Sequence, residues 1–146
     1  MEIVVIPVTP FAQNCSLIWD AGSKRGAFVD PGGDIQKLIS AASDHQVTIE
    51  KIILTHGHLD HVGGTVELAK HYDVPIIGPH LGDKFWLDAL MQQSQMFGFP
   101  PATPFVPNQW LNDKDTISVG ELTLEVLHCP GHTPGHVVLV ERTSNK

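Results

Sequence analysis

The sequence predicts an α/β domain in which helices pack on a mixed sheet. Short apolar segments alternate with amphipathic helical segments, and the predicted order is β-β-β-α-β-α-β-α-β-β-β. The chain has 146 residues, a length at which a single hydrophobic core forms readily. We therefore expect residues 1–146 to fold as one domain.

The first part of the chain is predicted to form an antiparallel meander followed by a helix. Three β-branched or aromatic segments bounded by turn residues are predicted strands: 3–8, 15–19 and 26–30. Pro7 favours a sheet edge or a strand end for the first of them, because proline cannot donate a ladder hydrogen bond. Asp34 is the expected N-cap of a helix whose apolar residues recur at helical spacing over 35–42.

The middle of the chain alternates buried strands with helices. Segments 51–54 and 74–77 are short and almost wholly apolar, as parallel strands buried on both faces are. Helices are predicted over 62–72 and 82–96, the latter followed by a proline-rich loop. Region 81–110 has two interpretations: a segment that simply covers the sheet, or a lid that sets specificity over a site.

Three further strands are predicted in the last part of the chain. They are predicted at 115–119, 122–128 and 136–141, the first two joined by a tight turn at Gly120-Glu121.

A net charge of −7 argues against nucleic acid or an anionic membrane surface as a partner. The N-terminus lacks the pattern of a signal peptide, so a cytoplasmic location is expected. Cys15 and Cys129 are expected to be buried, reduced thiols, with a disulfide as the alternative.

A cluster of metal-ligand side chains follows the predicted strand 51–54. His56, His58, Asp60 and His61 fall within six residues, and imidazole and carboxylate are ligands that Zn²⁺ accepts. His56 and His58 point the same way if the segment is extended, so both can bind one ion. A turn at Asp60-His61 would aim these two side chains at a second ion. The simpler interpretation of Asp60 is the N-cap of the next helix.

A third ligand for the first ion is expected from the segment CPGHTPGH, residues 129–136. His132 lies between two predicted strands and is the first choice, with His136 as second choice or as a supporting residue. His128 is expected to pack or to support the site. Surface positions are predicted for three other histidines: His45, His71 and His80.

The motif THGHLDH at residues 55–61, with PGHTPGH at 130–136, resembles the metallo-β-lactamase superfamily, in particular its glyoxalase II-like (hydroxyacylglutathione hydrolase) branch. The segments QNC at 13–15 and DPGG at 30–33 extend the resemblance along the chain. The resemblance implies an αββα sandwich with the metals at one end of two facing sheets. This chain would supply the first half of that sandwich and part of the second.

The resemblance also assigns the metal ligands residue by residue. His56, His58 and His132 match the ligands of the first metal, and Asp60 and His61 match ligands of the second. Asp30 matches a position that supports the metal-binding loop, its alternative being a plain turn residue at a strand end.

The sequence departs from the family pattern after these residues. The aspartate that bridges the metals and the last histidine of the second site come later in the family, and no aspartate follows His132 here. We therefore expect a C-terminally truncated chain with an incomplete second site. Its unpaired sheet edges and apolar faces would favour aggregation or oligomerisation, and the sequence leaves the oligomeric state open.

The chemistry implied is that of a zinc-dependent thioester hydrolase. Zinc held by three histidines lowers the pKa of its bound water to about 7 and so provides hydroxide at neutral pH. Asp60 is the candidate catalytic residue, which would orient or accept the proton. The expected cofactor is one or two zinc ions, with iron or manganese as alternatives, and the expected partner is a small thioester such as S-lactoylglutathione. The sequence contains no Gly-x-Ser-x-Gly motif, which argues against a serine esterase. The alternatives are an iron-dependent persulfide dioxygenase-like enzyme and a non-catalytic metal-binding fragment.

Overall fold

A five-stranded mixed sheet forms the centre of the fold. The computed structural model describes residues 1–8, 13–97, 104–130 and 133–141. The strands follow one another in the order β1-β2-β3-β4-β5; the first three are antiparallel, and β3, β4 and β5 run parallel. Their bounds are β1 Glu2–Val8, β2 Gln13–Trp19, β3 Arg25–Val29, β4 Thr48–Ile53 and β5 Ile76–Ile77. The predicted meander, the parallel buried strands and the edge position of Pro7 are confirmed.

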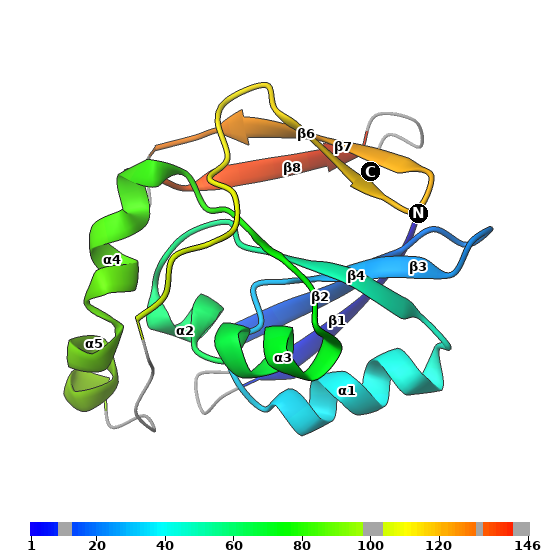
Figure 1. Cartoon of the computed structure of the whole chain (residues 1–146), viewed down its shortest axis with the longest axis horizontal. Helices are drawn as coiled ribbons and strands as arrows, with labels where there is room; N and C mark the ends of the chain where they lie inside the picture. The colour runs from blue at the N-terminus through cyan, green and yellow to red at the C-terminus, as the bar shows by residue number, and fades with distance from the viewer. Residues whose placement is uncertain (9–12, 98–103, 131–132, 142–146) are drawn as a thin grey trace.

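A smaller antiparallel sheet faces the first one (Figure 1). It has the order β6-β7-β8, with bounds β6 Thr116–Val119, β7 Leu122–His128 and β8 Val137–Glu141. The predicted turn between β6 and β7 is confirmed, and Gly120 adopts a φ of 56°, which suits a residue without a side chain. The Gly120 N–H donates to Glu50 Oε1 at 2.7 Å, which ties this hairpin to the larger sheet.

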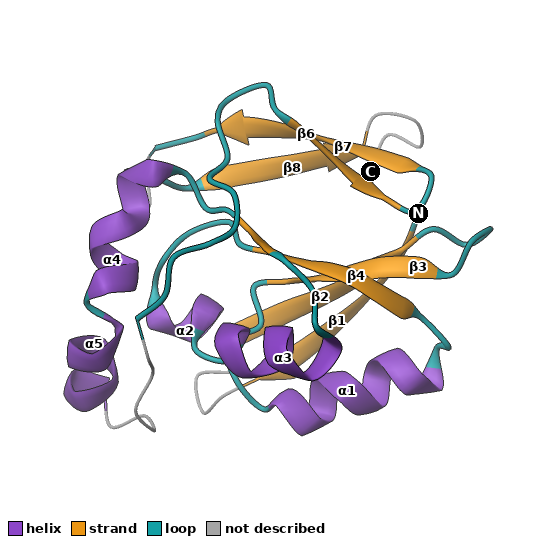
Figure 2. Cartoon of the chain, viewed as in Figure 1, coloured by secondary structure: helices purple, strands orange, loops and turns teal. Residues whose placement is uncertain are grey.

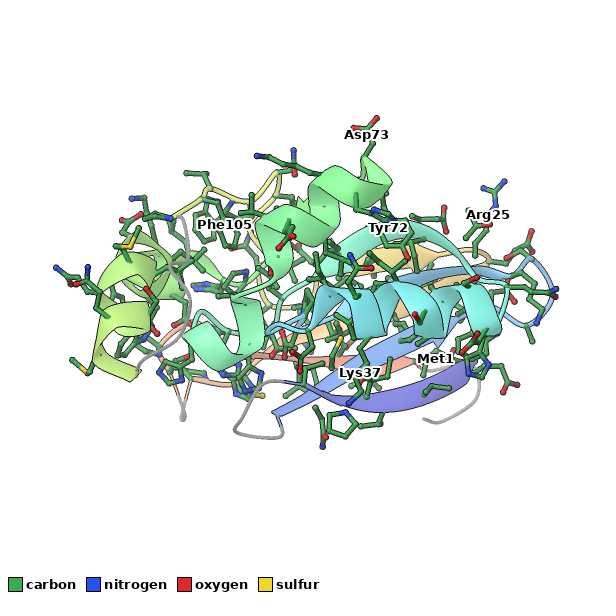
Figure 3. All side chains as sticks on the ribbon, turned by 90° about the horizontal axis from the view of Figure 1, so that it is seen from below. Met1, Arg25, Lys37, Tyr72, Asp73 and Phe105 are labelled. Atoms are coloured by element: carbon green, nitrogen blue, oxygen red, sulfur yellow. The ribbon has the colours of Figure 1, made fainter. Side chains whose placement is uncertain are left out.

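Two helices cover the outer face of the larger sheet (Figure 2). These are α1 Ile35–Asp44 and α3 Thr65–Tyr72, and a short helix, α2 Leu59–Val62, precedes α3. Lys37 of α1 reaches strand β1 (Figure 3), where its Nζ donates to the carbonyl of Pro7 at 2.7 Å. The exposed side chain of Asp73, just after α3, points away from the molecule in the same view.

The core has two parts, one on each face of the larger sheet. Alternate residues of a strand point to opposite faces, so Phe28 packs toward the helices while Ala27 packs toward the smaller sheet. The same alternation places Ile52 and Ile53 in different parts of the core. The described residues therefore form three layers, helices on sheet on sheet, which agrees with the predicted sandwich. Burial on both faces explains why β3 and β4 place apolar side chains on both sides of the sheet.

The helix predicted over 62–72 differs from the observed structure. It begins earlier, as α2, and is interrupted at Gly63-Gly64 before α3. A Cβ atom on Gly64 would lie 3.0 Å from the carbonyl oxygen of Pro31, so the chain packs too closely there for a larger residue. Because α2 starts at Leu59, Asp60 lies inside the helix, and the N-cap interpretation of Asp60 is wrong.

Two other helix predictions need correction. The segment predicted as one helix over 82–96 consists of three pieces: η1 Leu81–Asp83, α4 Lys84–Asp88 and α5 Leu90–Phe97. Asp34 is the residue before α1, as predicted, but it has a φ of 50° and its side chain makes no capping hydrogen bond. The left-handed backbone turns its side chain out of the geometry that an N-cap needs.

The two cysteines differ in their surroundings. Both are free thiols, as predicted, but only Cys15 is buried. Burial raises the pKa of the Cys15 thiol, so it remains protonated at neutral pH. Cys129 follows the end of β7 and is exposed, so its predicted burial is wrong. Within the described part of the chain, no helix has the length and apolar character needed to cross a membrane.

Candidate metal centre

The candidate site lies where two parallel strands end. Asp30 follows β3, and the histidine motif begins two residues after β4. The Asp30 N–H donates to the carbonyl of Ile53 at 2.9 Å, so the ends of the two strands are held side by side. Carboxyl ends of neighbouring parallel strands are where open α/β sheets place their sites.

Asp30 organises the loop that carries the histidines. Its Oδ1 accepts from the Thr55 N–H at 2.8 Å, and its Oδ2 accepts from the Thr55 hydroxyl at 2.5 Å. The same Oδ2 lies 3.1 Å from His61 Nδ1. Asp30 is 6% exposed and has a φ of 56°, so it is also the turn residue after β3. The predicted contact between Asp30 and the motif loop is confirmed.

Three potential ligands lie together at this position. One ligand atom each from Asp30, His56 and His61 can be chosen so that all three lie within 4.8 Å of one another. The ring of His56, which is 2% exposed, lies with its centre 3.8 Å from that of His61. Imidazole nitrogens and a carboxylate oxygen at this spacing suit a divalent metal ion.

His58 and His136 lie at the border of this group. Their ring centres are 5.3 Å and 5.1 Å from that of His56, each with the rings nearly perpendicular. The sharing of one ion by His56 and His58 stays a prediction. The other two predicted ligands lie outside what the structure describes: the whole of His132, and the side chain of Asp60, whose backbone forms part of α2.

The surroundings of the histidines include features that the sequence did not single out. Trp86 of α4 meets the His58 ring edge-on, with ring centres 4.6 Å apart. A pocket of about 340 Å³ between the two sheets is lined by Thr55 and His136, with mostly apolar side chains around them. The candidate site therefore has an aromatic wall on one side and an apolar hollow on another.

The remaining histidines are only partly as predicted. His45 and His71 are exposed, which confirms the prediction for these two. His80 is half-buried and stacks on His128, with ring centres 3.9 Å apart and an interplanar angle of 9°. Its Nδ1 accepts from the Gly82 N–H at 2.9 Å, while His128 Nε2 lies 2.8 Å from the carbonyl oxygen of Pro134. His80 is therefore half-buried, not the surface residue that was predicted, because this pair contacts the 133–136 loop.

The stacked pair predicts an acid sensitivity of the fold. Burial, and next the charge of His128, lower the pKa of His80, and Asp83 opposes this only in part. The unfolded chain then takes up the proton first, near pH 6.5, so the contribution of neutral His80 is lost as the pH falls through that value. We expect the free energy of unfolding of the metal-free protein to fall less between pH 7.5 and 5 in His80→Asn. Urea titrations at both pH values measure the free energy of unfolding. An equal loss of this free energy between pH 7.5 and 5 in the wild type and in His80→Asn would contradict the prediction.

Two facing sheets with a histidine and aspartate cluster at the strand ends define a metal-binding class of α/β protein. Residues 8–144 match the Metallo-beta-lactamase superfamily. The chain belongs to this superfamily, as the motif at residues 55–61 implied.

Relatives and solved structures support the placement. The chain is 44% identical over 142 residues to "Hydroxyacylglutathione hydrolase GloC" of Haemophilus influenzae, covering 97% of this chain and 66% of that protein. It is 33% identical to a hydroxyacylglutathione hydrolase of Aeromonas salmonicida, with coverage of 91% and 44%. It thus spans about two thirds of the length of the first relative and less than half of the second.

Two solved structures share the fold closely. The B3 metallo-β-lactamase BLEG-1 superposes with a TM-score of 0.86 at 30% identity, covering 98% of this chain and 68% of that one. TTHA1623, whose structure was determined in a di-iron-bound form, gives a TM-score of 0.84 at 26% identity, with coverage of 97% and 68%. The predicted fold class is therefore confirmed.

Proposed function

We propose that the chain is the metal-binding part of a metal-dependent hydrolase that cleaves thioesters of the hydroxyacylglutathione type. The observation that carries this proposal is the grouping of Asp30, His56 and His61 at the ends of β3 and β4. The proposal is supported by the 44% identity to a protein named as a hydroxyacylglutathione hydrolase.

The proposed ligands are those of the family resemblance. His56, His58 and His132 would hold the first ion, and Asp60 and His61 would belong to the second position. A bound divalent ion supplies Lewis acidity toward the thioester carbonyl and a water molecule of lowered pKa. We propose zinc for this ion, with iron or manganese as the alternatives, since a relative of the same fold is known in a di-iron form.

The residues of the chain would orient the ligands and shape the site. Asp30 Oδ2 fixes the His61 ring through Nδ1, which leaves Nε2 directed away from this contact for a metal. The Trp86 ring lies against the His58 ring and would limit the access of water from that side. For this reason we propose that α4, within region 81–110, is a wall of the site. Asp60 is the proposed residue that orients the attacking water or accepts its proton.

The experiment that tests this function combines metal analysis with two assays. The purified chain, loaded with zinc, is incubated with S-lactoylglutathione, and release of free thiol is measured. We expect release that stops when the zinc is chelated and returns when it is restored. Iron in the protein together with oxygen uptake on glutathione persulfide would favour the dioxygenase-like alternative. Metal binding without either reaction would favour the non-catalytic alternative.

The number of metal ions per chain is a separate prediction. Three histidines provide one set of protein ligands for a single ion, and within these 146 residues no aspartate follows His132 to bridge a second one. We therefore expect the 146-residue chain to hold at most about one zinc ion tightly. Metal analysis after dialysis against a weak chelator measures this number. Two retained ions would show that another residue, or a second chain, replaces the bridging aspartate.

A further inference from the structure

Asp83 is the most completely buried carboxylate among the described residues that lie near the candidate metal centre. It closes η1 and is 0% exposed. Its Oδ2 accepts from the Gly57 N–H at 2.8 Å and from the Thr133 hydroxyl at 2.7 Å. Its Oδ1 accepts from the Gly135 N–H at 2.7 Å. One side chain thus binds two loops that are far apart in the sequence.

Both loops belong to the candidate site. Gly57 lies between His56 and His58, and Thr133 directly follows His132 in the sequence. A buried carboxylate without partners would be costly, so the three donors stabilise Asp83 and Asp83 in turn fixes their positions. Hydrogen bonds to an ionised acceptor are also stronger than those between neutral groups.

The packing around Asp83 leaves no room for the loops to shift toward it. A Cβ atom on Gly135 would lie 2.5 Å from the Asp83 backbone nitrogen. A Cβ atom on Gly57 would lie 3.1 Å from the Asp83 carbonyl oxygen and 2.9 Å from Trp86 Cβ. Both loops therefore approach Asp83 through glycines, and the carboxylate sits in a close-fitting contact between them.

We propose that Asp83 is a positioning residue of the metal centre, which sets the spacing between the 56–58 loop and the 133–136 loop. This role rests on the proposed function, because it acts on residues proposed as ligands. Metal ligands from two segments bind one ion well only if the segments are held at the right separation. Asp83 would provide that separation before the metal arrives.

The substitution Asp83→Asn tests this proposal with almost no change in volume. An asparagine side chain has one oxygen, so it can accept from the Gly57 N–H or from the Gly135 N–H, while its NH₂ group faces the other donor. One loop therefore loses its anchor. We expect the dissociation constant for zinc to rise about 10–100-fold, as for other residues that support metal ligands. The visible spectrum of the cobalt-substituted protein should change as well.

A second pair of variants keeps the test valid if Asp83→Asn does not fold. Thr133→Val has nearly the same shape but lacks the hydroxyl that donates to Asp83, whereas Thr133→Ser retains it. We expect weaker zinc binding and an altered cobalt spectrum in Thr133→Val, and recovery of both in Thr133→Ser. Asp88→Asn is the matched control, because Asp88 is an exposed carboxylate on α4 paired only with Lys84 at 2.8 Å among the described side chains.

The readouts separate a positioning role from a merely structural one. A structural role would lower the thermal stability of the metal-free chain but leave the cobalt spectrum and zinc affinity of the folded molecules unchanged. Wild-type zinc affinity and cobalt spectrum in both Asp83→Asn and Thr133→Val would overturn the role of Asp83 while the proposed function stands. A wild-type chain that binds neither zinc nor cobalt would overturn the metal centre itself, and the role of Asp83 with it.

Discussion

Replacing His132 or His58 with alanine is expected to empty the metal centre, whereas Asp60→Ala is expected to leave it filled. Each histidine is one of three proposed ligands of the first ion, and the two come from separate segments of the chain. Loss of either should remove the tightly held zinc, lowering the content from about one ion per chain to nearly none. Asp60 is proposed for the second position, so its loss should leave the three histidines in place.

The measurement is zinc per chain after dialysis against a weak chelator, with thermal unfolding in parallel. Binding to a site that exists only in the folded state also stabilises the fold, so zinc should raise the unfolding temperature of Asp60→Ala but not of His132→Ala. His71→Ala is the control, because His71 is an exposed histidine at the end of α3. An empty site in Asp60→Ala together with a full one in His132→Ala would show that the ligands are divided differently.

The largest loss of stability is expected for Phe28→Ala. Phe28 is fully buried in β3, between the sheet and the covering helices, and its ring lies 6.1 Å from that of Tyr72 in α3. Removing a buried phenylalanine side chain costs about 3–5 kcal/mol, through lost burial and the cavity that remains. This is a large fraction of the free energy of unfolding of a domain, which is about 5–15 kcal/mol.

Urea denaturation of the metal-free chain measures this loss directly. Val106→Ala is the control, since Val106 is 68% exposed and an exposed truncation should change the stability by less than about 0.5 kcal/mol. Phe28→Leu should lie between the two, because leucine fills part of the cavity. A loss below about 1 kcal/mol in Phe28→Ala would contradict the two-part core, in which β3 is packed on both faces.

The residues of the expected acid sensitivity and of the proposed metal positioning lie in the same part of the fold. His80 and His128 stack on each other and contact the 133–136 loop, and Asp83 is hydrogen-bonded both to that loop and to the histidine motif. The two effects are separable, because His80→Asn changes the pH dependence of unfolding without removing an acceptor from Gly57 or Gly135. Comparing it with Asp83→Asn therefore distinguishes stability of the loop from its alignment with the metal ligands.

Local sequence determined the strands and the chemical type of the site. Apolar β-branched segments bounded by turn residues are a strong local signal, and in the described part of the chain eight strands lie at or near their predicted positions. The histidine motif likewise showed its chemistry directly, because three imidazoles and a carboxylate in six residues have few other uses. Helix boundaries depend on more than local sequence: Gly64, at the break between α2 and α3, lies close to Pro31, which is far away in the sequence.

Only the tertiary structure revealed the contacts of Asp83 and the burial state of the other polar residues. In the sequence, Asp83 is one acidic residue at the start of a predicted helix, and nothing local distinguishes it from the exposed Asp88. Its partners, Gly57 and Gly135, become its neighbours only when the two sheets pack face to face. The stacking of His80 on His128 has the same origin. Residue type and spacing determine which metal ligands and which strands a chain can form. Contacts between distant segments determine which buried carboxylate is hydrogen-bonded to the loops that carry those ligands.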